Sequence, residues 1–216
     1  MKDTPPLPAA RLTEAIRSRI LDGDFAPGQR LVEADLCAAF DTGRRQVREA
    51  LAALTHEALV EQIANKGARV RTVDPEEALH LSEARFILER ACLEHACAHV
   101  TEGEIAALRG LGRDIDAAIL NGDPVTYAAL SAGLFRLYVD LAAQPILAEL
   151  LEGLEARNGR YRNRIGLMPG WLKTSGPLRL EMIEALCARD ATRAVAALTL
   201  HHEKWKAALA RLSDPA

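Results

Sequence analysis

The sequence predicts a mainly helical protein, with an N-terminal winged helix-turn-helix that carries a small β-hairpin wing and a C-terminal bundle of six helices. Alanine and leucine dominate the 216 residues, and aromatic residues make up only 4% of them. This composition favours helices over a β-sandwich or barrel. Apolar residues recur at helical spacing along most of the chain, and a β-prone stretch occurs only between Leu59 and Val73.

The N-terminal part begins with the proline-rich segment TPPLP, which cannot be helical. Amphipathic stretches then predict three helices, with a tight turn at Asp41-Thr42-Gly43 before the third. Two β-prone runs flank Asn65-Lys66-Gly67, which is a hairpin signal. Helix, helix, turn, helix and hairpin in succession are the layout of a winged helix-turn-helix. The expected helices are 9–21, 33–40 and 44–57, and the expected strands are 59–63 and 68–73.

A domain boundary is expected at Asp74-Pro75, because an aspartate caps a helix N-terminus well and proline suits the first helical position. We therefore predict a winged helix-turn-helix domain over residues 1–73 and an all-helical domain over residues 74–216. The second domain is expected to bind an effector and to dimerise. Its predicted helices are 75–99, 102–120, 123–142, 145–160, 175–188 and 190–212, with a break over 166–176.

Composition and motifs exclude several classes of protein. No apolar run approaches the ~20 residues that span a bilayer, and the N-terminus has no apolar core of a secretory signal, so a cytoplasmic location is expected. No catalytic triad, paired carboxylates or glycine-rich phosphate loop stands in a supporting motif. An enzyme built on the helical bundle is the alternative from a different class. Four cysteines without a C-x-x-C pair are expected to be free thiols: Cys37, Cys92, Cys97 and Cys187.

The third helix carries a local basic face although the chain has a net charge of −3. Its outward side near the N-terminal end consists of Arg44, Arg45, Gln46 and Arg48. Arginine matches the edge of guanine with two hydrogen bonds, glutamine can do the same for adenine, and a helix N-terminus favours phosphate. The pattern indicates a DNA recognition helix; the alternative is an ordinary solvated helix face.

Residues 10–73 resemble the DNA-binding domain of GntR-type transcriptional regulators. The motifs are G-x-x-x-P-G-x-x-L from Gly23 to Leu31, V-R-E-A-L from Val47 to Leu51 and L-x-x-x-x-L-V from Leu54 to Val60. A serine common in the family is Gly43 here, so its phosphate-donating hydroxyl is absent. We expect an operator with a different base preference but the usual palindromic form. The resemblance implies DNA contacts at Gly43, Arg44, Arg45, Gln46 and Arg48, with Lys66 and Gly67 in the wing.

The helical remainder is similar to the FCD effector-binding domain. The similarity rests on E-A-R-F-I-L-E-R-A over residues 83–91, on Q-P-I-L after Leu134-Phe135, and on I-E-A-L-C-A-R-D-A over residues 183–191. It implies a ligand-responsive regulator, a repressor of a catabolic operon, that binds a palindromic operator on double-stranded DNA as a homodimer.

Many FCD domains hold a divalent metal with one aspartate and three histidines. Here the matching positions are Ala132, Arg136, Arg179 and His201. Metal ions such as Zn²⁺ need imidazole, thiolate or carboxylate ligands, and a guanidinium group repels them. We therefore expect a site without metal or other cofactor.

Arginine in place of a metal still suits an anionic ligand, because guanidinium binds carboxylate by charge and by paired hydrogen bonds. Arg85 lies within an apolar stripe, where a buried arginine needs a partner. One interpretation is that Arg85, Arg136 and Arg179 converge on a small organic acid, with His201 as a further polar contact. The alternatives are an internal pair of Arg85 with Glu89, and a purely structural site in a regulator that responds to a protein partner.

Two further features are weaker candidates. Cys92, His95 and His99 share one helix face and could hold a metal, although small core cysteines and surface histidines are the commoner interpretation. Trp171 is expected in the loop before the fifth helix of the bundle, where it either covers the effector site or simply packs.

Overall fold

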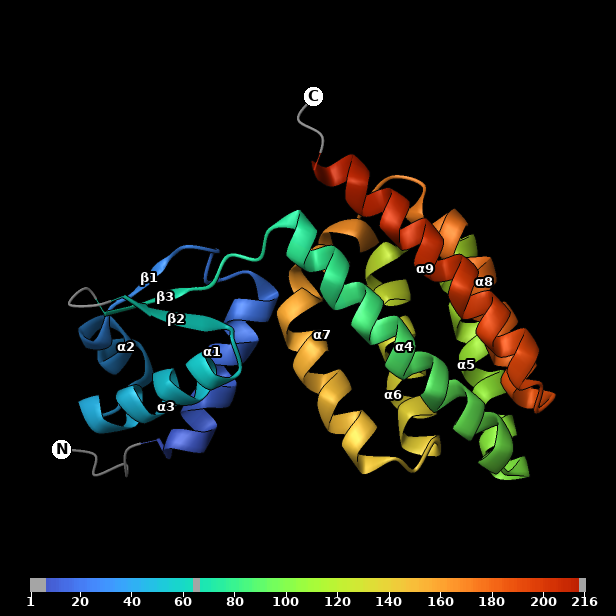
Figure 1. Cartoon of the computed structure of the whole chain (residues 1–216), viewed down its shortest axis with the longest axis horizontal. Coiled ribbons are helices and arrows are strands. Elements are labelled where there is room, and N and C mark those ends of the chain that lie inside the picture. The colour runs from blue at the N-terminus through green and yellow to red at the C-terminus, as the bar shows by residue number, and fades with distance from the viewer. Residues whose placement is uncertain (1–6, 64–66, 214–216) are drawn as a thin grey trace. The chain divides into compact units, whose positions relative to one another are not determined.

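The computed structural model describes residues 7–63 and 67–213 (Figure 1). The chain forms two compact units that divide between Asp74 and Pro75, one residue after the boundary that the sequence predicts. No helix in the described part of the chain is long and apolar enough to cross a membrane.

The first unit contains three helices and a small antiparallel sheet of strand order β1-β3-β2. The hairpin strands pair from Val60 with Val70 to Ile63 with Gly67, as the turn signal predicts. The two-residue strand β1 was not expected from the sequence; it adds to the free edge of β3. The elements are α1 (Ala9–Asp22), β1 (Arg30–Leu31), α2 (Glu33–Phe40), α3 (Arg44–His56), β2 (Val60–Ile63) and β3 (Gly67–Val70).

Packing between α1 and α3 forms the centre of the first unit. Leu12 and Ile16 on α1 and Leu54 on α3 are fully buried. At the margin of this contact, Arg17 donates two hydrogen bonds to the carboxylate of Glu57, from Nε at 2.8 Å and from Nη2 at 2.7 Å. These contacts fix α3 against the unit by one face and leave its other face to solvent.

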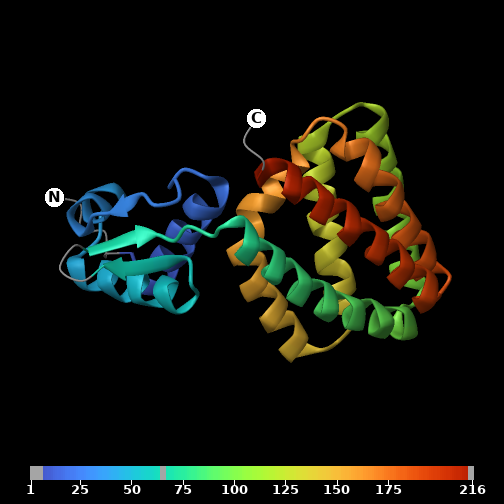
Figure 2. The same ribbon diagram turned by 45° about the horizontal axis from the view of Figure 1, so that its top comes forward.

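The second unit is an all-helical bundle, and α4 lies along one side of it (Figure 2). Helix α4 packs against α6, α7, α8 and α9, while α5 packs against α6 and α8. Thr101 and Glu104 form a reciprocal capping box at the start of α5, and Asp123 caps α6. The helices are α4 (Pro75–His99), α5 (Glu102–Leu120), α6 (Pro124–Leu141), α7 (Pro145–Gly166), α8 (Trp171–Cys187) and α9 (Ala191–Ser213).

The region between α7 and α8 differs from the sequence prediction. Helix α7 continues to Gly166, and α8 begins at Trp171, so the expected break is present but covers only residues 167–170 instead of 166–176. Trp171 is the first residue of α8 and is buried rather than placed in a loop. Gly176 and Pro177, which indicate a break in the sequence, lie inside α8. The glycine serves packing, since a Cβ atom there would lie 2.4 Å from Cδ1 of Ile119 on α5.

We expect Gly176→Ala to lower the free energy of unfolding by about 1–3 kcal/mol, because the added methyl group overpacks the contact between α8 and α5. Gly133→Ala on α6 is the matched control, since a Cβ atom there meets nothing within 4 Å. The control should raise stability by up to about 1 kcal/mol through the better helix propensity of alanine. Urea unfolding measures both; equal effects of the two changes would contradict this account of Gly176.

Candidate functional site

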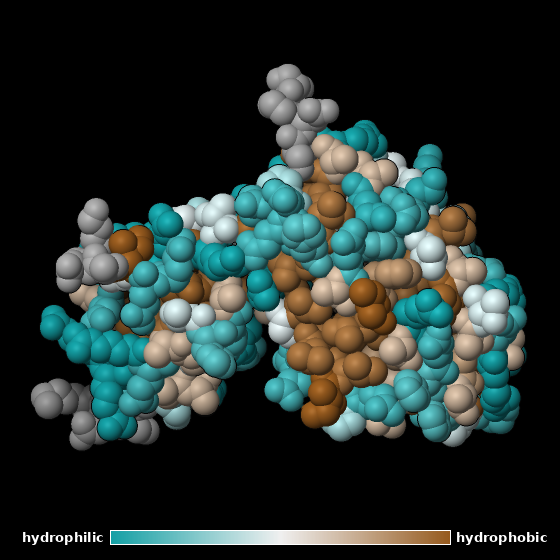
Figure 3. All heavy atoms as spheres, in the orientation of Figure 1, coloured by the Kyte–Doolittle hydropathy of each residue, from teal (hydrophilic) through white to brown (hydrophobic). Residues whose placement is uncertain are grey.

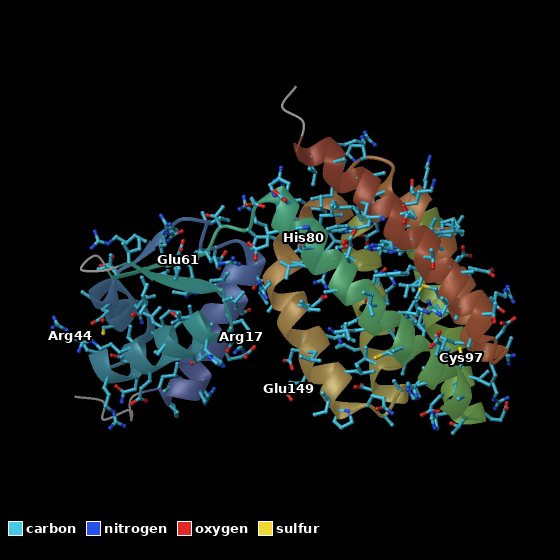
Figure 4. The ribbon with its side chains drawn as sticks, in the orientation of Figure 1. Arg17, Arg44, Glu61, His80, Cys97 and Glu149 are labelled. Carbon is cyan, nitrogen blue, oxygen red and sulfur yellow. The ribbon has the colours of Figure 1, made fainter. Side chains whose placement is uncertain are left out.

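Helix α3 presents a basic, solvent-exposed face at its N-terminal end. Val47, Leu51 and Leu54 point into the core, which leaves Arg44, Arg45 and Arg48 exposed. Figure 4 shows the Arg44 side chain extending outward from the start of α3. Among the described residues Arg44 has no ion-pair partner.

The other two arginines of this face are held by acids of the same unit. Arg45 lies 3.4 Å from Glu49 on the next turn of α3. Arg48 donates from Nε to both carboxylate oxygens of Glu33 on α2, at 3.0 Å each. This hydrogen bond and the charge of Glu33 raise the pKa of Arg48. The α2 carboxylate therefore orients Arg48 on the exposed face before any DNA is bound.

At the start of α3, the side chain of Gln46 lies against Gly43. Gly43 is the residue before the first helical position, and a Cβ atom on it would lie 2.8 Å from Oε1 of Gln46. The glutamine side chain thus occupies space that a larger residue at position 43 would require.

The wing is described in part. Gly67 begins β3 with φ of 84°, a left-handed conformation that favours glycine. Lys66, the predicted phosphate contact at the wing tip, lies outside the described residues. On the neighbouring strand, Glu61 pairs with Arg69 at 2.5 Å (Figure 4).

A cluster of charged side chains lies inside the second unit, centred on Glu89 of α4. Glu89 accepts hydrogen bonds from Arg85 Nε at 2.9 Å, from Arg85 Nη2 at 2.7 Å and from Tyr138 on α6 at 2.9 Å. Arg85 also pairs with Glu155 of α7, and Glu155 pairs with Arg162. The guanidinium of Arg85 lies 4.5 Å from the centre of the Phe135 ring. The structure therefore contains the internal pair of Arg85 with Glu89, which is the alternative to an effector contact given for Arg85 above.

Arg179 on α8 is buried next to this cluster with its charge unpaired. It is 8% exposed, and no carboxylate of the described residues lies within ion-pair distance. Its Nε has no hydrogen-bond partner in the described structure, and its Nη1 contacts only the sulfur of Met182 at 3.7 Å. A guanidinium group that is buried in this way is costly unless an anion joins it.

A hydrogen-bonded chain of neutral groups lies beside Arg179. The hydroxyl groups of Tyr127 and Ser175 are 2.6 Å apart, and Ser175 Oγ lies 2.9 Å from Nε2 of His201. Trp171 packs edge-on against the His201 ring, with centroids 5.5 Å apart. Burial, followed by the positive charges of Arg179 and Arg85, holds the pKa of His201 well below its ordinary value. His201 is therefore neutral and acts as a hydrogen-bonding group.

Of the four predicted effector residues, Arg85, Arg179 and His201 lie within electrostatic reach of one another, but Arg136 does not join them inside. Arg136 is exposed on α6, and its positive charge acts on Arg162. The prediction that Arg136 converges on a ligand with Arg179 stays a prediction, and the structure places Arg136 at an exposed position on α6.

The positions that match the family's metal ligands do not fit a metal ion here. Ala132 has no donor atom, and the Nε2 of His201 is taken by Ser175. The guanidinium of Arg179 occupies the third position and repels a cation. Within the described residues, no three side chains of His, Cys, Asp or Glu gather as a metal site, the group around Cys92 and His95 included.

Sequence reasoning missed four polar residues of the cluster, which are Tyr127, Tyr138, Glu155 and Ser175. Each lies at a position where helical spacing predicts ordinary core or surface roles. A signal existed only for Glu155, since it lies seven residues before Arg162 and therefore on the same face of α7.

Two family models match the chain. The model of bacterial regulatory proteins of the gntR family matches residues 8–70, and the FCD domain model matches residues 80–204. The FCD match alone covers more than half of the chain. The chain belongs to the GntR family of bacterial regulators and carries an FCD domain. It is therefore a DNA-binding transcriptional regulator, and members of this family are not enzymes.

Curated relatives of this GntR regulator cover different shares of it. The Nta operon transcriptional regulator of Aminobacter aminovorans is 39% identical over 39% of this chain and 40% of its own length. The regulator YdhC of Bacillus subtilis is 26% identical over 63% of this chain and 62% of its own. The chain thus spans less than two thirds of both. The repressor NanR of Salmonella newport is 25% identical over 91% of this chain and 84% of its own.

Solved structures share the fold of this GntR regulator. The E. coli protein McbR/YncC superimposes with a TM-score of 0.81 at 20% identity, covering 95% of this chain and 98% of its own. A GntR-type regulator from Rhodococcus superimposes with a TM-score of 0.74 at 25% identity, covering 94% and 97%. The fold of this chain is therefore shared with these proteins, and the residues inside the bundle carry what is particular to this member.

We expect Glu89→Gln to lower the free energy of unfolding by about 3–5 kcal/mol, because the change leaves a buried excess of positive charge. Glu181→Gln is the control, since Glu181 makes an exposed ion pair with Arg193, and it should cost less than about 1 kcal/mol. Denaturant titration at neutral pH compares the two variants.

Glu89→Gln should also change how the stability of the protein depends on pH. Arg85, Arg179 and Tyr138 lower the pKa of Glu89 in the folded state, although burial opposes them. Glu89 therefore stabilises the fold above the ordinary carboxyl pKa of 4.5, and this contribution is lost as the pH falls through the folded-state value. As the pH falls from 4.5 to the folded-state pKa of Glu89, the stability of Glu89→Gln should fall less steeply than the stability of the natural protein, and equal slopes would contradict the role given to Glu89.

Proposed function

We propose that this GntR regulator is a repressor that binds a palindromic operator as a homodimer and responds to a small organic acid held without metal in its FCD domain. The observation that carries the effector part is the buried, unpaired guanidinium of Arg179. The name of the NanR relative supports the repressor role.

The DNA-binding part rests on the exposed face of α3. One guanidinium, that of Arg44, is unpaired in the described structure, and a second, that of Arg48, is oriented by Glu33. Base edges in the major groove accept such groups, while phosphates accept the helix N-terminus. One winged helix makes too few base contacts for specific affinity, so two half-sites are the usual solution.

We expect Arg44→Ala and Arg48→Ala each to weaken operator binding by about 1–3 kcal/mol, if both side chains contact base edges. Arg11→Ala is the matched control, because Arg11 is an exposed arginine of the same unit on α1. Gel shifts with operator and random DNA at fixed salt separate the contributions. An equal loss on both DNAs for Arg44→Ala would assign that residue to phosphate instead.

Dimerisation is supported by an apolar surface on the FCD domain. Ile87 on α4 and Ile146 and Leu150 on α7 are 65%, 67% and 52% exposed. Helices α4 and α7 pack side by side, and Figure 3 shows apolar side chains gathered over them. Large exposed apolar patches mark interaction surfaces, and a two-fold axis through this one would pair it with its own copy.

We expect Leu150→Glu to convert the dimer to monomer, because it places two like charges near the proposed two-fold axis. Leu120→Glu on α5 is the control, since Leu120 is 78% exposed but lies outside the α4–α7 surface. Sedimentation at micromolar concentration compares the two variants, and operator affinity should fall for Leu150→Glu alone. A natural protein that is strictly monomeric with and without DNA would rule out this proposal.

The effector part rests on Arg179 and its neighbours. A carboxylate placed against Arg179 would satisfy the free Nε, with the hydrogen-bonded pair of His201 and Ser175 beside it. In this proposal Arg85 and Glu89 stabilise the site, and Arg136 takes no part. Guanidinium thus replaces the metal ion as the anion-binding group.

We expect Arg179→Ala to abolish the effect of organic acids on thermal stability, and Arg179→Lys to restore it only in part, since an ammonium group lacks the planar fork. Screening by thermal shift and calorimetry with organic acids measures both. Stoichiometric zinc, nickel or manganese in the purified protein, or binding that a chelator removes, would overturn the metal-free proposal. Unchanged affinity in both variants would overturn the role of Arg179.

A further inference from the structure

The charged cluster of the FCD domain contains more positive than negative groups. Its guanidinium groups belong to Arg85, Arg162 and Arg179, and its carboxylates belong to Glu89 and Glu155. His201 and Tyr138 are neutral members, because burial disfavours the charged form of both. Among the described groups in contact, one positive charge therefore remains without a negative counterpart.

The two carboxylates are already occupied. Glu89 accepts from two nitrogens of Arg85, at 2.9 Å and 2.7 Å, and from Tyr138 at 2.9 Å. Glu155 pairs with both Arg85 and Arg162. Arg85 is equally occupied, since it binds both acids and lies 4.5 Å from the Phe135 ring centre. All three hydrogen bonds to Glu89 fall on Oε1, and the charge of Glu89 acts on Arg179 without a direct ion pair among the described residues. Neither acid therefore pairs directly with Arg179, and the Nε, Nη1 and Nη2 atoms of Arg85 are all engaged by the two acids.

Arg179 therefore carries the unbalanced charge. It is nine-tenths buried, its Nε has no partner in the described structure, and its only polar contact is the weak one to Met182. One negative charge placed against it would bring the cluster to neutrality. A second would be buried close to Glu89 and Glu155 with no remaining cation, which is strongly unfavourable at low dielectric.

We propose that the effector is a monoanion, a monocarboxylate whose single charge pairs with Arg179, and that Glu89 and Glu155 exclude dianions. This inference rests on the proposed organic-acid effector and narrows its chemical class. Dicarboxylates and phosphate monoesters, which carry about two charges at neutral pH, fall outside this class. Arg136 is left out of this count because it is exposed to water on α6 and has no ion pair with these groups in the described structure, although its charge acts on Arg162.

The test compares acids that differ by one carboxyl group on the same carbon skeleton. Butyrate against succinate, and benzoate against phthalate, are the probes, measured with the full-length protein at pH 7.5 and constant ionic strength by thermal shift and calorimetry. We expect the monocarboxylate of at least one pair to bind at least ten-fold more tightly than its dicarboxylate. Arg136→Ala should leave this ratio unchanged.

A charge variant tests the reason for the preference. Glu155→Gln removes one carboxylate from the cluster and leaves two unbalanced positive charges, so its preference should move toward the dicarboxylate by at least ten-fold. The preference of the natural protein is an independent measurement should this variant not fold.

The outcomes separate this inference from the proposal on which it rests. If dicarboxylates bind more tightly to the natural protein, or if Glu155→Gln folds and keeps the original ratio, the charge limit is wrong and the organic-acid effector stands. If no acid of either pair binds, the monocarboxylate assignment is overturned. Operator binding in a gel shift then still reports whether the protein acts as a DNA-binding regulator.

Discussion

The FCD bundle depends on how it accommodates charge at its centre. Glu89 lies on α4, which packs against four other helices, and it is buried among guanidinium groups and a tyrosine hydroxyl. A single buried carboxylate would be costly, and so would the arginines without it. Their mutual contacts hold α4, α6 and α7 in register. The same charged cluster thus fixes the positions of these helices and sets which polar groups a ligand would meet.

This arrangement shows how one fold can change its ligand chemistry without changing its helices. The bundle superimposes on distant family members, so the apolar contacts between helices fix the frame. Within that frame, the positions of the family's metal ligands hold Ala132, Arg136 and Arg179 beside a remaining histidine. In the proposed metal-free site, such a change would remove the dependence on metal supply and replace a coordination geometry with hydrogen-bond geometry.

Periodicity and capping residues predicted most helices within one or two residues, because each helix buries one regular apolar stripe. Prediction failed at Gly176-Pro177, where a local breaking signal is overridden by close packing on Ile119. It succeeded for the recognition helix, whose exposed arginines lie opposite its core residues. It could not decide the partners of Arg85 or the exposure of Arg136, since both depend on which side chains other helices bring near.

The ion pair between Arg48 and Glu33 has a consequence for how this protein discriminates among DNA sequences. Glu33 offers Arg48 two oxygen acceptors at 3.0 Å, much as a phosphate or a guanine edge would. In the proposed complex, Arg48 would gain from DNA only the difference between the new acceptor and the one it leaves. At a poorly matched DNA site this difference would be small, so the carboxylate of Glu33 would compete with DNA for Arg48.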